Sequence, residues 1–116
     1  MAVSFIVSRA LRSLAIGLLT IALTGPAAAA PSFPCRGKLT STERAICADA
    51  DLADLDRRMA REYAFQLSQQ TTRSARKYLR TSQRQWLKER NRCGDSVPCI
   101  AAEYHQWIEQ LVEWNL

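Results

Sequence analysis

The chain has 116 residues and four cysteines, and 16 Lys and Arg against 11 Asp and Glu give it a formal net charge of +5. This length leaves room for one small domain and excludes a large multidomain enzyme. A domain of this size buries only a modest core and often needs covalent cross-links to be stable.

The N-terminal residues have the pattern of a secretory signal peptide. Arg9 and Arg12 form a basic start, the apolar run Leu14 to Leu23 follows, and small alanines come next. These are the three parts that a signal peptidase substrate needs. The apolar run is about half the roughly 20 residues of a transmembrane helix, so a cleaved signal is favoured over an uncleaved anchor.

We expect the signal peptide to cover residues 1–29, with cleavage about Ala29 or Ala30, and a single domain to cover residues 30–116. A lipid anchor is the alternative. Lipidation needs small apolar residues before the cysteine, whereas Cys35 follows Ser-Phe-Pro. The expected product is a soluble periplasmic or secreted protein that is neither lipid-anchored nor membrane-spanning after cleavage.

All four cysteines lie in the expected mature domain, and their number is even. In an oxidising compartment this predicts two disulfides. A zinc site is the alternative, but no CxxC spacing is present and His105 is the only histidine. The first choice is the two sequence-local pairs, Cys35–Cys47 and Cys93–Cys99, while crossed pairings remain open.

Charge is unevenly distributed along the domain. Residues 43–62 hold six acids and four bases, residues 73–92 hold eight bases and one acid, and the chain after Cys93 holds four acids and no base. The basic segment is either a solvated helix face or a surface for an anionic glycan or lipid. No nucleic-acid-binding motif accompanies these cations, so nucleic acid is not an expected partner.

Helix-start signals appear early in the domain. Thr40 and Glu43 have the spacing of a capping box, which predicts a short helix ending about Cys47. Asp49 or Asp51 can cap the helix that follows.

Three later segments carry apolar residues at helical steps of three and four. The expected core residues are Leu52, Leu55, Met59 and Tyr63 in the first segment, Leu79 and Trp86 in the second, and Ile100, Tyr104, Ile108 and Leu111 in the third. Trp107 and Trp114 flank the third stripe.

Between the second and third segments, Gly94 suits a helix end and Pro98 suits a first helical turn. The expected fold class is all-α: a compact antiparallel bundle of three main helices plus a short N-terminal helix. The helix order brings all four cysteines to one end of this bundle, so the disulfides are expected there.

No catalytic constellation emerges from the sequence. His105 stands alone and is interpreted as a surface residue. The aspartates 49, 51, 54 and 56 lack the pattern of a calcium loop, and we interpret them as a helix cap and a solvated face. No phosphate loop or cofactor motif is present, so we expect neither an enzyme, nor a cofactor, nor a metal.

The chain resembles the LprI N-terminal domain family of small exported proteins, one branch of which binds and inhibits lysozyme. The matching residues are Cys35, STERAIC at 41–47, DLADLD at 51–56, Tyr63, QRQWLKERNRC at 83–93, Cys99, Tyr104 and Leu111. The resemblance implies an all-helical, disulfide-bonded domain. It also implies that the partner is a lysozyme or another wall-lytic enzyme.

The candidate contact is the segment around the second cysteine pair. Lysozyme cuts with two carboxylates in an open cleft, and a cation could plug it. The candidate partner-binding residues are Arg90, Asn91, Arg92, Asp95 and Ser96. For Arg90 the alternative is structural: it lies four residues after Trp86 and can pack over that ring or pair with an acid of the first long helix.

Overall fold

The computed structural model describes residues 17–21 and 29–115, so most of the expected signal peptide lies outside the described residues. Four helices form: α1 (Ser41–Ala48), α2 (Ala50–Gln69), α3 (Arg73–Asn91) and α4 (Val97–Val112). The described part of the chain has no strand, and none of its helices is long and apolar enough to span a membrane. The all-α fold class is confirmed.

The first two helices begin at side-chain caps. The Thr40 hydroxyl accepts a hydrogen bond from the Glu43 amide at 3.1 Å, and the Glu43 carboxylate accepts one from the Thr40 amide at 3.0 Å. This is the expected capping box. Asp49 ends α1 and caps α2, because its carboxylate accepts hydrogen bonds from the amides of Asp51 and Leu52. One aspartate therefore sets the break between the two helices.

The other two helices have hydroxyl caps. Thr72 accepts a hydrogen bond from the Ala75 amide at the start of α3, and Ser96 accepts one from the Cys99 amide at the start of α4. Between these helices Gly94 has φ +58, a left-handed conformation that other residues adopt at a cost. The chain can therefore reverse within residues 92–96, which we call the α3–α4 turn.

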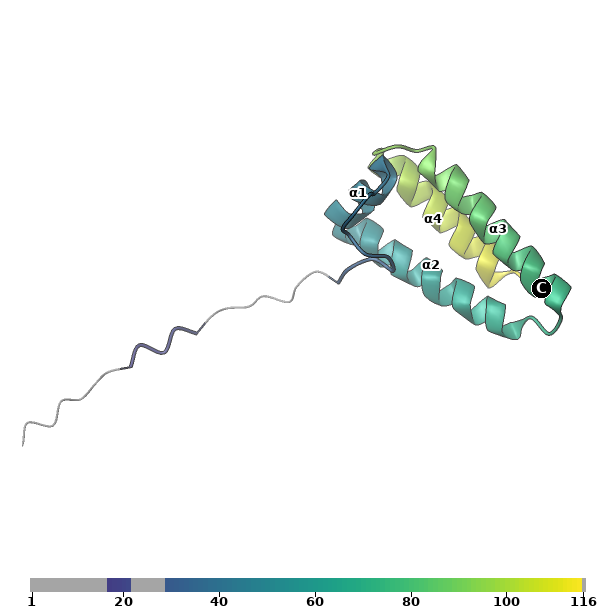
Figure 1. Ribbon diagram of the computed structural model, residues 1–116, viewed down its shortest axis with the longest axis horizontal. Helices are drawn as coiled ribbons and strands as arrows, with labels where there is room; N and C mark the ends of the chain where they lie inside the picture. Colours follow the sequence, from purple (N-terminus) through teal and green to yellow (C-terminus); the bar gives the residue numbers. More distant parts are fainter. Residues whose placement is uncertain (1–16, 22–28, 116) are drawn as a thin grey trace, which may run out of the picture.

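Helices α2, α3 and α4 run along the length of the bundle, and α1 packs across one end of it, beside the α3–α4 turn (Figure 1). The buried core comprises Ile46, Leu52, Leu55, Met59, Leu79, Trp86, Ile100, Tyr104, Trp107 and Leu111. Tyr63 and Ile108, expected in the core, are half-buried and pack against it. Trp107 takes the buried position that the sequence suggested for Ile108.

Both disulfides lie at the α1 end of the bundle, because Cys47 is in the last turn of α1 and Cys93 is in the α3–α4 turn beside that helix. Cys35 pairs with Cys47 and Cys93 pairs with Cys99, which confirms the sequence-local pairing. The first disulfide fastens the segment before α1 to its last turn. The second closes the α3–α4 turn, and this turn carries most of the expected partner-binding residues.

Candidate functional site

The five candidate partner-binding residues differ in how they are placed. Arg92, Asp95 and Ser96 are exposed on the α3–α4 turn, and Asn91 is half-buried at the end of α3. Arg90 is only 4% exposed. Its guanidinium points into the core rather than toward a partner, and the exposed surface of the site is therefore made by the turn itself.

The α3–α4 turn is held from inside the domain. Thr42 of α1 is fully buried, and its hydroxyl is within hydrogen-bonding distance of the Gly94 carbonyl, at 2.6 Å, and of the Asn91 carbonyl, at 3.3 Å. Within the turn, the amide of Cys93 donates to the Arg90 carbonyl at 3.0 Å. The Cys93–Cys99 disulfide adds a covalent link, so this short surface segment has little freedom to lose on binding.

Arg90 joins three helices beneath the turn. Its Nη1 donates to the Tyr104 hydroxyl of α4 at 3.0 Å, and that hydroxyl donates to Asp56 Oδ1 of α2 at 2.8 Å. Arg90 Nε and Nη2 both donate to Asn91 Oδ1. The guanidinium also lies 5.7 Å from the centre of the Trp86 ring. A structural role for Arg90 predicted contact with the Trp86 ring or with an acid of the first long helix. Both contacts are present, the acid being Asp56.

Asp56 is a correction to the sequence interpretation. It was expected on a solvated face together with the neighbouring aspartates, yet it is only 1% exposed. Its second carboxylate oxygen accepts a hydrogen bond from the Ser32 amide at 2.6 Å. The physical reason is helical register: Asp56 lies four residues after Leu52 and three before Met59, so it falls on the apolar stripe.

Burial raises the pKa of Tyr104 well above the ordinary range of a tyrosine; the charge of Arg90 opposes this rise and the charge of Asp56 adds to it. The phenol therefore remains a hydrogen-bond donor at any physiological pH. A permanently protonated Tyr104 suits its position between Asp56, which only accepts hydrogen bonds when ionised, and Arg90, which only donates them.

The exposed charges on the turn are few. Arg92 is paired with Glu89 at 3.0 Å, but its side chain is 76% exposed. Such a surface pair contributes little to stability and can be exchanged for a partner's carboxylate. Asp95 stands beside it on the turn and is also exposed. The turn thus offers one accessible guanidinium on a fixed backbone.

A second charged surface lies along α3. Arg73, Lys77, Arg80, Arg84 and Lys88 are all exposed and follow one another at steps of three or four residues. This spacing puts all five on one helix face, which we call the α3 cationic stripe. No ion pair within residues 29–115 involves any of the five.

The sequence pattern alone does not predict two features of the site. Thr42 lies within the STERAIC motif, and no local pattern marks it as the residue that fastens the turn to α1. A groove between α3 and α4 is lined by Trp86, Trp107 and Trp114, which were interpreted only as core or flanking residues. The available signal was the presence of tryptophans on two helices expected to pack together, Trp86 on α3 and Trp107 on α4, with Trp114 just after the end of α4.

Residues 35–98 match the sequence model of the family described as Lysozyme inhibitor LprI. The match begins at the first cysteine, covers α1, α2 and α3, and ends just after the α3–α4 turn. No curated protein and no solved structure matches the chain.

Proposed function

The chain belongs to the LprI lysozyme-inhibitor family, and we propose that it is an exported protein that binds a lysozyme or related wall-lytic enzyme and occludes its cleft. The match over residues 35–98 carries this proposal. An inhibitor of this kind needs a fixed projection rather than an active site, because it acts by filling space and supplying charge.

The α3–α4 turn is the contact we propose. Retaining glycosidases place two carboxylates about 5–5.5 Å apart. A guanidinium can bind such carboxylates through parallel hydrogen bonds. Arg92 is the exposed guanidinium on the turn, with Asp95 and Ser96 beside it. Arg90 and Asn91 act from beneath as positioning residues, since Arg90 is buried and donates two hydrogen bonds to Asn91.

The test is inhibition of cell-wall lysis by the oxidised domain, with several lysozyme classes as targets. Arg92→Ala should weaken inhibition of the sensitive class at least about tenfold, because truncating a desolvated charged contact costs roughly 2–5 kcal/mol. Arg84→Ala is the matched control: it removes an exposed arginine of α3 that lies away from the turn. Equal inhibition by wild type and Arg92→Ala would exclude the turn, and no inhibition of any class would exclude the function.

Export is the second part of the proposal. It is supported by two disulfides, which form in oxidising compartments, and by the signal-like pattern of residues 1–29. N-terminal sequencing of the protein recovered from outside the cytoplasm should begin about Ala30. A mature protein that still begins at Met1 would contradict it.

The α3 cationic stripe supports a second candidate function, binding of an anionic envelope glycan or lipid. Five exposed cations on one face, without ion-pair partners among the described residues, form a continuous positive surface. Binding to vesicles with anionic headgroups should fall steeply between low and physiological salt, because exposed charges are screened. Lys77→Glu with Arg80→Glu should abolish it while leaving lysozyme inhibition unchanged.

A further inference from the structure

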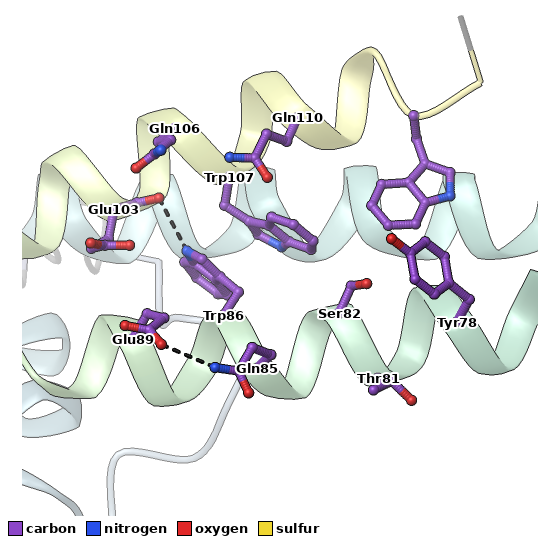
Figure 2. Close-up of a pocket in the computed structure, with 11 residues that line it drawn as sticks. Tyr78, Thr81, Ser82, Gln85, Trp86, Glu89, Glu103, Gln106, Trp107 and Gln110 are labelled. Atoms are coloured by element: carbon purple, nitrogen blue, oxygen red, sulfur yellow. Dashed lines mark hydrogen bonds between the residues drawn. The ribbon is translucent and has the colours of Figure 1, made fainter.

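A groove of about 620 Å³ runs between α3 and α4 (Figure 2). Side chains from the two helices face each other across it, Tyr78 and Trp86 from α3 and Trp107 and Gln110 from α4, while Gln85 lies along α3 and donates a hydrogen bond to Glu89. The α3–α4 turn and the α3 cationic stripe lie outside this groove, although Glu89 of its rim is paired with Arg92 of the turn. The groove is therefore a candidate for a separate binding site.

Aromatic rings follow one another along the groove. Trp86 and Trp107 are stacked with ring centres 5.9 Å apart, Trp114 lies 6.0 Å from Trp107, and Tyr78 lies 5.6 Å from Trp114. The first two tryptophans are buried and contribute an apolar floor. Trp114 is half-buried and Tyr78 is 67% exposed, so this pair offers ring surface to a ligand.

Tyr78 is held in position although it is exposed. Its ring is tilted by 36° against that of Trp114, and Figure 2 shows its hydroxyl end directed toward α4. An exposed tyrosine usually loses rotational freedom when a ligand covers it. Here the neighbouring indole already restricts the ring, which lowers that cost.

The groove is polar at its rim and lacks cations. Amides of Gln85, Gln106 and Gln110, hydroxyls of Thr81 and Ser82, and carboxylates of Glu89 and Glu103 surround the rings, and no Lys or Arg is among the described residues that line it. Amides and hydroxyls both donate and accept hydrogen bonds. The lining offers an anionic ligand two carboxylates and no cation of its own, and Arg92 beside the groove is already paired with Glu89. The rim therefore favours a neutral ligand rich in hydroxyl and amide groups.

The buried indoles cannot serve as hydrogen-bond donors to a ligand. The Trp86 N–H donates to the Glu103 carbonyl at 3.2 Å, and the Trp107 N–H donates to Gln83 Oε1 at 2.7 Å. Grooves that hold proline-rich peptides combine aromatic walls with recognition of an extended peptide backbone. The N–H groups of Trp86 and Trp107 are therefore unavailable to the carbonyls of a proline-rich peptide, which leaves such a ligand fewer donors along the floor of the groove.

We propose that the α3–α4 groove binds a neutral saccharide chain, of the amino-sugar type found in cell-wall glycans. A sugar ring has an apolar C–H face, which can lie against Tyr78 and Trp114, and a hydroxyl edge, which can exchange hydrogen bonds with Gln106 and Gln110. Aromatic rings carry a partial negative charge on their faces, which attracts the polarised C–H groups. The site is independent of the lysozyme contact and would place the protein on the wall itself.

The experiment uses the oxidised full-length mature protein and the tetramer of N-acetylglucosamine as probe. All three tryptophans of the chain line the groove, so intrinsic tryptophan fluorescence reports ligand binding there. A saturable fluorescence change is expected, with a dissociation constant that is unaffected by salt because the ligand is neutral. Tyr78→Ala should weaken binding about tenfold, as expected for loss of an aromatic contact.

Matched variants separate groove binding from general damage. Tyr78→Phe keeps the ring and should retain most of the affinity. Phe65→Ala removes another exposed aromatic, on α2 and outside the groove, and should bind like wild type. The proposal is overturned if the tetramer causes no saturable change, if Phe65→Ala and Tyr78→Ala lose affinity equally, or if only a proline-rich peptide saturates the groove.

The proposed lysozyme contact and the proposed saccharide site can be tested separately. Tyr78→Ala should inhibit a sensitive lysozyme as wild type does, and Arg92→Ala should bind the tetramer as wild type does. Loss of both activities in either single variant would indicate one shared surface and would contradict an independent saccharide site.

Discussion

The guanidinium of Arg90 and the carboxylate of Asp56 lie 3.9 Å apart inside the bundle, and the hydroxyl of Tyr104 is hydrogen-bonded to both. The three residues come from α3, α2 and α4, so a single polar cluster ties the three long helices together. Each group is satisfied by the other two or by a neighbour, and no buried side-chain N or O atom of the described residues lacks a partner. Such a cluster is stable only when it is complete.

Replacement of Asp56 should therefore destabilise the fold strongly. Asp56→Ala leaves Arg90 as an uncompensated buried charge, and we expect a loss of about 3–5 kcal/mol in the free energy of unfolding, measured by urea denaturation with the disulfides intact. Asp54→Ala is the control, because Asp54 forms an exposed pair with Arg57 and should cost less than about 1 kcal/mol. Similar losses in the two variants would mean that the cluster is not a stabilising unit.

Burial of Tyr104 predicts that the stability of the fold depends on pH at alkaline pH. Burial raises its pKa in the folded state above the value of about 10 in the unfolded chain. The folded protein thus binds more protons than the unfolded one above this value, so stability is fully present below about pH 10 and falls as pH rises further. The slope should be at most about 1.4 kcal/mol per pH unit for this one group.

The measurement is urea unfolding at several pH values between about 8 and 11. Tyr104→Phe should be less stable at neutral pH, because Asp56 and Arg90 lose their shared partner, and its stability should fall less steeply above pH 10. Tyr63→Phe should keep the wild-type slope. An unchanged slope in Tyr104→Phe would show that another group titrates.

Much of the fold could be predicted because local signals agree with the tertiary structure. The capping box at Thr40, the Asp49 cap and the Gly94 turn depend on neighbours within a few residues, and each forms as expected. The disulfides follow the same logic, since both close short segments. Helical periodicity then placed eight of the ten expected core residues in the buried set.

The features of the fold that could not be predicted from the sequence depend on contacts between helices. Asp56 lies on the apolar stripe of α2. Its carboxylate can be buried only because Tyr104 and Arg90, from other helices, supply a hydrogen bond and an opposite charge. Trp107 and Ile108 are adjacent on α4, and the stacking of Trp107 on Trp86 decides which of them is buried. No single-segment pattern contains that information. The same holds for the saccharide groove, which exists only where α3 and α4 meet.

The two disulfides should differ in what their removal does. The chain-entropy relation assigns about 2 kcal/mol to a six-residue separation and about 3 kcal/mol to a twelve-residue one, the separations of Cys93–Cys99 and Cys35–Cys47. Replacing both members of a pair by Ser should therefore destabilise the domain more at Cys35 and Cys47. Lysozyme affinity should follow the opposite order, because Cys93 and Cys99 close the proposed contact. Urea unfolding and inhibition assays on the same two variants check this, and parallel losses would argue against a preorganised turn.

Thr42 offers a test of the turn from inside the protein. Thr42→Val keeps the side-chain shape but removes the hydroxyl whose oxygen lies 2.6 Å from the Gly94 carbonyl, so we expect a loss of about 1–3 kcal/mol in the free energy of unfolding. Thr42→Ser keeps the hydroxyl and should lose only about 1 kcal/mol for the missing methyl group.

Hydrogen exchange locates the effect of this change. The amides of Cys93 and Ser96 donate hydrogen bonds within or at the turn, and both should exchange faster in Thr42→Val than in Thr42→Ser. The Gln70 amide, bonded to Leu67 at the other end of the bundle, serves as the internal reference. If Thr42→Val, which alters no exposed atom, also weakens lysozyme inhibition, the order of the turn contributes to affinity. If inhibition is unchanged although the amides exchange faster, the partner binds the surface of the turn without requiring its rigidity.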